Sequence, residues 1–187
     1  IYEVSGISQD RTHQEIVAGH QFTPENIRLD ETLKKWGEAS GYFDGTSSIT
    51  LEDSQDFDFS GGEWSVDFWV NAKTFARGEA KLLEKRTDRD NYMIVMADGG
   101  GQVYFQINKT GTMRFSLTDT GAVIDLDQWH HIAVTEDGDQ YYLFIDGVLK
   151  ASANSKVRAE NYTGSLQIGT GDHGAGVQHL SGYLDEL

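Results

Sequence analysis

The chain has 187 residues, which is enough for one domain with a substantial hydrophobic core. Its 30 acidic and 15 basic residues give a formal net charge of −15 at pH 7, so we expect nucleic acids and anionic membrane surfaces to repel it. Cysteine is absent, which excludes disulfide bonds, thiolate nucleophiles and zinc sites built on cysteine. The sequence contains no run of 18 apolar residues, so no membrane insertion is predicted.

The first 40 residues differ from the rest of the chain in composition and in the alternation of apolar and polar residues. They contain the single proline, Pro24, and a polar mixture without strong alternation. Residues 26–37 fit either one or two helical turns or a loose connection. We therefore predict that residues 1–35 form an N-terminal strand or arm. The chain begins with Ile1 rather than Met and stops after Leu187 inside a strand-like run, which favours a piece of a longer protein.

Strand-like runs recur from Gly41 onward. In the clearest run, residues 64–70, the side chains at 64, 66, 68 and 70 are apolar, whereas Ser65 and Asp67 lie between them together with Trp69. Because side chains alternate along a strand, the first set is predicted to face a core and the second to face a partly covered surface.

Turn signals separate the later runs. Glycine and aspartate turns at 98–101, 136–139 and 146–147 predict three hairpins, because these residues tolerate left-handed backbone conformations. We count about a dozen short strands and find no convincing helical pattern after residue 40. The sequence therefore predicts an all-β fold, a sandwich of two antiparallel sheets.

Seven short motifs occur in a recognisable order, the second of which combines FDF with the glycine pair that follows it. They are WGEASGYFDG at 36–45, FDF at 57–59, GG at 61–62, WSVDFWV at 64–70, LLEK at 82–85, WHHIAV at 129–134, YLFIDG at 142–147 and GYLDEL at 182–187. Over residues 36–187 this series resembles the laminin-G-like, concanavalin A-like (lectin/glucanase) jelly-roll domains of bacterial and phage surface proteins. Residues 1–35 have no counterpart in the resemblance.

The resemblance implies a function and a cofactor. It implies a non-catalytic carbohydrate-binding or adhesion module of a larger extracellular, cell-surface or virion-surface protein. The alternative is a structural or decoration domain that contacts neighbouring protein subunits in an assembly. It also implies a structural calcium ion, which prefers oxygen ligands. We assign Asp44, Gly45 and Asp185 to calcium, because the two ends of such a domain are commonly neighbours.

Glycan recognition requires aromatic rings for stacking and polar groups for hydroxyls. Trp69 and Tyr92 are the aromatic candidates. The alternative is that each ring packs in the core or on a sheet face without binding a ligand. In the glycine-rich segment 169–176, Asp172 and His173 are the polar candidates. The alternative there is a flexible hairpin tip.

Catalysis is not predicted. Related glycanases place Glu-x-Asp-x-x-Glu on one strand, and this spacing is missing from the sequence, as are the serine-elbow, P-loop and zinc-helix motifs. His130 and His131 are adjacent titratable residues on one predicted strand. The resemblance favours a structural role for them. Trp129 is predicted to lie between the sheets, and Trp64, Phe68 and Phe144 are predicted to be mostly buried as well.

Overall fold

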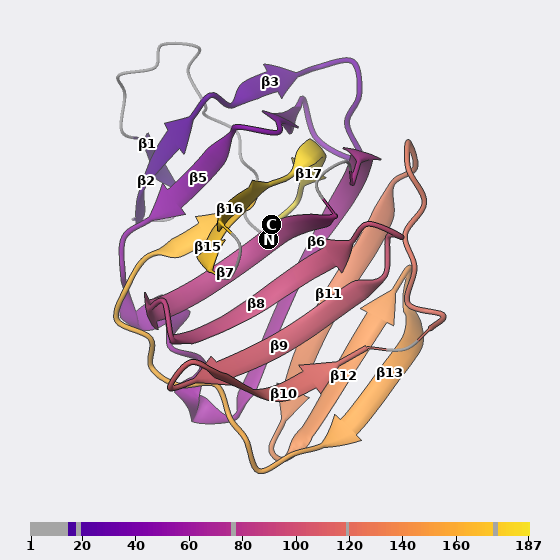
Figure 1. Cartoon of the computed structure of the whole chain (residues 1–187). Coiled ribbons are helices and arrows are strands. Elements are labelled where there is room, and N and C mark those ends of the chain that lie inside the picture. Colours follow the sequence, from indigo (N-terminus) through magenta and orange to yellow (C-terminus); the bar gives the residue numbers. More distant parts are fainter. Residues whose placement is uncertain (1–14, 18–19, 76–77, 119, 174–175) are drawn as a thin grey trace.

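A computed structural model describes residues 15–17, 20–75, 78–118, 120–173 and 176–187. Two antiparallel sheets pack face to face and enclose a single main core (Figure 1). The predicted all-β jelly-roll sandwich is therefore confirmed.

The larger sheet has eight strands. In spatial order they are β1 (Glu15–Val17), β2 (His20–Glu25), β5 (Ser48–Leu51), β14 (Leu166–Ile168), β7 (Glu79–Asp88), β8 (Asn91–Asp98), β9 (Val103–Lys109) and β10 (Thr112–Leu117).

The second sheet has seven strands. In spatial order they are β13 (Val148–Asn154), β12 (Gln140–Ile145), β11 (His130–Asp137), β6 (Glu63–Thr74), β17 (Ser181–Asp185), β4 (Ser40–Asp44) and β3 (Arg28–Asp30). A small hairpin, β15 (Thr170–His173) and β16 (Gly176–His179), forms a separate two-stranded sheet. Two 3-10 turns, η1 (Gln55–Phe57) and η2 (Phe59–Gly61), precede β6. Within the described ranges, no helix is long and apolar enough to cross a membrane.

Part of the region predicted as an N-terminal arm is built into the sandwich. Strand β2 pairs with β5 in the larger sheet, and β3 pairs with β4 in the second sheet. Of the two possibilities left open for residues 26–37, the loose connection is confirmed, with β3 inside it. Residues 1–14 and 18–19 lie outside the described part of the chain.

The core confirms the predicted faces of β6. Phe68 and Val70 are fully buried, and Trp64 packs edge-on against Phe105 at a ring-centroid distance of 5.6 Å. Val66, on the same face, is partly buried against the core. Alternation along a strand therefore identified the inward side chains of β6 correctly.

Two aromatic residues expected in the core lie elsewhere. Trp129 packs against the outer-face residue Tyr183 at a centroid distance of 6.4 Å, so its predicted place between the sheets is wrong. Phe144 is also only partly buried, because Leu143 and Ile145 take the inward positions of β12. The three predicted hairpins are confirmed, and Asp146 and Gly147 have φ of 53° and 73° at the β12–β13 turn.

Candidate functional site

The outer face of the seven-stranded sheet carries a polar and aromatic cluster where β6 pairs with β11. Trp69 is the cross-strand partner of His131, and their ring centroids are 5.1 Å apart. Nε2 of His131 lies 2.9 Å from Oδ2 of Asp67, which also points to the outer face. The neighbours Phe68 and Ile132 are buried, which fixes this cluster on the solvent side of the sheet.

The loop between β3 and β4 brings two more residues to this cluster. Nζ of Lys35 lies 4.0 Å from the centroid of the Trp69 ring and 5.8 Å from that of Trp36. Trp36 is 57% exposed, whereas the other three tryptophans are only partly exposed. Trp36 therefore offers the most accessible large aromatic surface of the cluster. Because Lys35 and His131 already contact Trp69, the predicted stacking on Trp69 is less favourable than stacking on Trp36.

Asp185 holds this loop in place. Its Oδ2 accepts hydrogen bonds from the backbone N–H groups of Lys35, at 2.8 Å, and of Trp36, at 3.0 Å. Asp185 is the last residue of β17 and is 8% exposed, so it anchors the loop to the sheet. Hydrogen bonds to a carboxylate are stronger than neutral ones, and they restrict the position of Trp36.

The predicted calcium site at Asp44, Gly45 and Asp185 is wrong. Strand β17 pairs with β4 so that Asp44 faces Ser181, which is four residues from Asp185. At roughly 3.3 Å per residue the backbone positions of Asp44 and Asp185 are about 13 Å apart along the strands, too far for two aspartate side chains to bind one ion at about 2.3–2.6 Å.

Protein donors already occupy the carboxylate of Asp44. Oδ1 of Asp44 accepts hydrogen bonds from N and Oγ1 of Thr46 and from Oγ of Ser47. The hydroxyl of Thr46 contributes most to lowering the pKa of Asp44. The backbone N–H of Gly45 donates to the carbonyl of Leu180. Among the described residues, no group of three or more histidine or acidic side chains is placed to hold a metal ion.

Tyr92 lies on the outer face of the eight-stranded sheet, away from Trp69. It is 5% exposed and packs with Ile94 and Met96 in a second apolar cluster. Its hydroxyl accepts a hydrogen bond from Nδ2 of Asn108 at 2.5 Å. Burial, helped by the charge of Glu84, raises the pKa of Tyr92 to about 12. The prediction that Tyr92 stacks on a sugar is wrong, because its ring is buried.

Asp172 and His173 belong to β15, so the segment predicted as a glycine-rich loop is a short hairpin. His173 pairs with Gly176 in the ladder between β15 and β16. A Cβ at Gly171 would lie 2.8 Å from Oε2 of Glu84, so glycine permits the close approach of the hairpin to β7. The side chains of Asp172 and His173 lie outside the described part, and their role stays a prediction.

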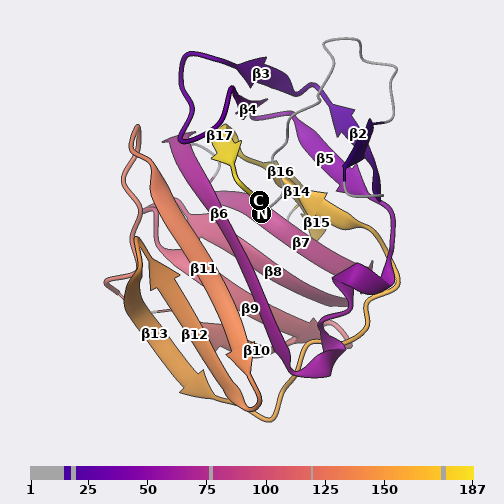
Figure 2. The ribbon, with the colours of Figure 1, turned by 180° about the vertical axis from the view of Figure 1, so that it is seen from behind.

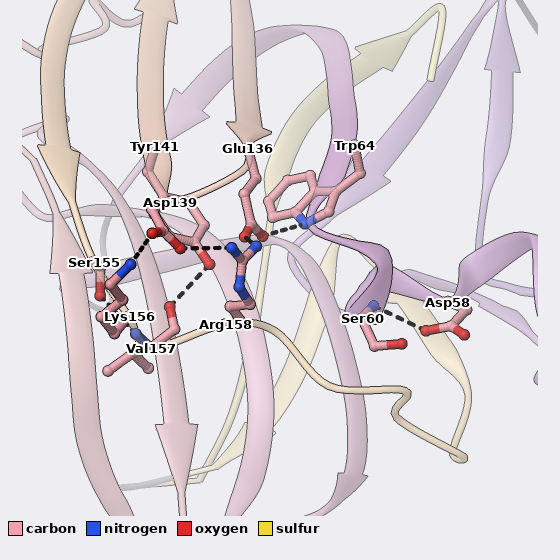
Figure 3. A network of polar contacts seen from close by, with 10 residues as sticks. All are labelled: Asp58, Ser60, Trp64, Glu136, Asp139, Tyr141, Ser155, Lys156, Val157 and Arg158. Atoms are coloured by element: carbon pink, nitrogen blue, oxygen red, sulfur yellow. Dashed lines mark hydrogen bonds and ion pairs between the residues drawn. The ribbon is translucent and has the colours of Figure 1, made fainter.

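A buried polar network at the far end of β6 and β11 ties the segment after β13 to the seven-stranded sheet (Figure 3). The carboxylate of Glu136 has a fully buried side chain, and it accepts hydrogen bonds from Nε1 of Trp64 at 2.7 Å and from Nη1 of Arg158 at 2.6 Å. Nη2 of Arg158 bonds Asp139 at 2.6 Å. Because the carboxylates of Glu136 and Asp139 are both paired with Arg158, the network is best explained as one that stabilises the fold.

His130 also has structural partners. Its Nδ1 lies 2.8 Å from Oδ2 of Asp146, and its Nε2 accepts a hydrogen bond from the backbone N–H of Asp125. Both ring nitrogens are engaged within the protein, which supports the structural interpretation of His130.

The strand order defines the class of protein as an antiparallel jelly-roll β-sandwich. Residues 43–187 match the family described as the concanavalin A-like lectin/glucanases superfamily, and the chain belongs to that superfamily. The resemblance found in the sequence is thereby confirmed. No curated protein matches the chain by sequence.

Three solved structures share the fold. Domain 4 of AbnA, a GH43 extracellular arabinanase from Geobacillus stearothermophilus solved with arabinotriose, has a TM-score of 0.68 and 19% identity, covering 88% of this chain and 79% of that chain. The CBM40 module of the Ruminococcus gnavus IT-sialidase, bound to α2,3-sialyllactose, has a TM-score of 0.58 and 15% identity, with coverages of 79% and 86%. Domains LG4-5 of the mouse laminin α1 chain have a TM-score of 0.57 and 14% identity, with coverages of 78% and 39%.

Sequence reasoning included Trp69 among the candidates but did not include Lys35 and Trp36, which lie beside it. Trp36 was recognised only as part of a family motif, although charged residues surround it at 34, 35 and 38. An aromatic residue among charged ones outside a strand pattern is typical of an exposed ring, and this signal could have identified it.

Proposed function

We propose that the protein is a non-catalytic carbohydrate-binding module of a larger extracellular or surface protein, with its glycan at the cluster formed by Lys35, Trp36, Asp67, Trp69 and His131. The exposed ring of Trp36 carries the proposal, because its backbone is fixed by Asp185 beside groups that can bond hydroxyls. A rigid aromatic surface next to a few polar groups is the arrangement that a sugar ring requires.

Each polar group of the cluster has a distinct task. The side chain of Asp67 is 59% exposed and accepts hydrogen bonds from sugar hydroxyls. The ammonium of Lys35 donates, and it also lies over the ring of Trp69. The side chain of His131 is 26% exposed and is oriented by Asp67. The surface is shallow, so binding is expected to be weak.

The similar structures support a glycan ligand. One is described in complex with arabinotriose and another bound to sialyllactose, and the first is part of an extracellular enzyme. Their likeness to this chain is a likeness of fold. The choice of Trp36 as the stacking residue rests on the cluster described above.

The test is a glycan array followed by titration calorimetry, with arabinotriose and α2,3-sialyllactose as the first probes. Trp36→Ala should weaken binding of a confirmed sugar by about tenfold or more, since one aromatic–sugar stacking contact contributes on the order of 1–2 kcal/mol. Asp67→Asn should weaken it less, because an amide oxygen still accepts hydrogen bonds.

The control is Tyr142→Ala, which removes a partly exposed ring from β12 on the same outer face. Equal affinities of the Trp36→Ala variant and the unmodified protein would reject the cluster. The double variant Asp172→Ala, His173→Ala tests the β15–β16 hairpin as the other proposed glycan site. Thermal melting of each variant shows whether the fold is retained.

One observation favours the alternative of a protein-contacting assembly domain. Val148 and Leu149 begin the edge strand β13 and are 55% and 49% exposed. Adjacent exposed apolar residues on a sheet edge are typical of protein contacts. Light scattering over a concentration series would detect self-association, and the variant Val148→Lys should abolish it.

A further inference from the structure

Lys35 carries a positive charge that no carboxylate of the protein neutralises directly. Its Nζ lies 4.0 Å from the centroid of the Trp69 ring and 5.8 Å from that of the Trp36 ring. Among the residues that the structure describes, no carboxylate oxygen lies within 4.0 Å of this nitrogen. The three N–H donors of the ammonium are therefore available to an acceptor on a ligand.

The position of Lys35 is fixed before any ligand binds. The loop between β3 and β4 lies beside β17 (Figure 2), where Oδ2 of Asp185 accepts the backbone N–H of Lys35 at 2.8 Å. Lys35 is only partly exposed, and its ammonium lies over the ring of Trp69. A cation held in this way loses little conformational freedom when it binds an anion.

The other charged groups of the cluster already have partners. Oδ2 of Asp67 lies 2.9 Å from Nε2 of His131, and Oδ2 of Asp185 accepts two backbone N–H groups. The adjacent Lys34 differs from Lys35, because its Nζ donates to the backbone carbonyl of residue 38 at 2.8 Å. Lys35 is therefore the charged group of this cluster that is best placed to bind a charge on the ligand.

We propose that the cluster prefers a sugar with a carboxylate bonded to its ring, a uronic acid or sialic acid residue. The ring stacks on Trp36 and the carboxylate accepts hydrogen bonds from Nζ of Lys35. This inference rests on the proposed function, because it uses the same stacking surface. Hydrogen bonds between ionised groups are stronger than those between neutral groups. Next to two indole rings the effective dielectric is lower than in bulk water, which strengthens the attraction.

The net charge of −15 acts on a different length scale. At physiological ionic strength, exposed charges more than about 8 Å apart are largely screened from each other. A carboxylate hydrogen-bonded to Lys35 is much closer than this, so the local contact decides the preference. The overall charge mainly slows the approach of an acidic glycan.

The test compares trigalacturonic acid and α2,3-sialyllactose, each with its own methyl ester, by titration calorimetry. Esterification removes the charge and keeps the sugar ring, so it isolates the carboxylate. At least one acid should bind about fivefold or more tightly than its ester, since hydrogen bonds to charged groups contribute more than neutral ones. Lys35→Gln should make the two affinities equal, whereas Lys35→Arg should keep the preference because it keeps the cation.

Lys34→Gln is the matched control, because it removes the neighbouring positive charge and should leave the preference for the acid unchanged. Three results would overturn the proposal: equal affinities of acid and ester, a preference that survives Lys35→Gln, or no measurable binding of either acid. A neutral sugar whose binding depends on Trp36 would still support the proposed function in each of these cases. If no glycan binding depends on Trp36, both proposals fail.

Discussion

Single carboxylates in this protein act mainly by holding other groups in place. Asp185 binds two backbone N–H groups of the Trp36 loop, and Asp44 binds the turn that follows its own strand. Glu136 binds Trp64 and Arg158 inside the sandwich. Acidic residues are abundant here, so the presence of an aspartate was a poor guide to a metal ligand, as the assignment of Asp44 and Asp185 to calcium illustrates.

The polar network around Glu136 predicts that replacing Arg158 strongly lowers the stability of the fold. Arg158→Met should lower the free energy of unfolding by about 3 kcal/mol, because it leaves the fully buried carboxylate of Glu136 without its charged partner. The measurement is urea unfolding followed by tryptophan fluorescence.

A lysine in the same network supplies the control. Lys156 pairs with Asp139 but its side chain is 86% exposed, so Lys156→Met should cost less than about 1 kcal/mol. Equal costs for the two variants would show that burial of Glu136 does not decide the stability of this network.

At the scale of elements, the end of β3 is fixed by an aspartate turn. Oδ1 of Asp30 accepts hydrogen bonds from Oγ1 of Thr32 at 2.6 Å, from N of Thr32 at 2.8 Å and from N of Leu33 at 2.9 Å. These bonds, led by the one from the Thr32 hydroxyl, lower the pKa of Asp30 from 3.8 to about 2. The turn begins the loop that carries Lys35 and Trp36.

This shift predicts a loss of stability in acid. The pKa of Asp30 is lower in the folded state than in the unfolded chain, so the unfolded state takes up the proton first as pH falls. The stabilisation is present above about pH 4 and is lost as pH falls toward 2. Urea midpoints measured from pH 5 to pH 2 should therefore fall less steeply in Asp30→Asn than in the unmodified protein.

The neighbouring variant Glu31→Gln removes one negative charge from the same turn and serves as the comparison. The difference in slope between the two variants isolates the hydrogen bonds of Asp30 from the loss of charge. Identical slopes would mean that the turn does not bind the ionised carboxylate.

At the scale of the whole molecule, alternation in the sequence predicted the fold better than the site. Residues 64–70 alternate clearly, and their inward face was predicted correctly. Residues 141–145 are all apolar or aromatic, so their sequence could not show that Phe144 faces outward. The distance between Asp44 and Asp185 depends on the ladder register of β4 and β17, which local patterns do not contain.

The shared core predicts that the two sheets unfold together. Phe68 is 1% exposed and belongs to the core cluster that both sheets contribute to, so Phe68→Ala should lower the free energy of unfolding by about 3–5 kcal/mol. Phe144→Ala removes the same ring from the outer face of β12 and should cost markedly less, since that ring is only partly buried. Circular dichroism and tryptophan fluorescence should give the same urea midpoint in each variant, because unfolding either sheet exposes the core face of the other. Two separate transitions, or a larger loss for Phe144→Ala, would contradict a core in which Phe68 couples the two layers.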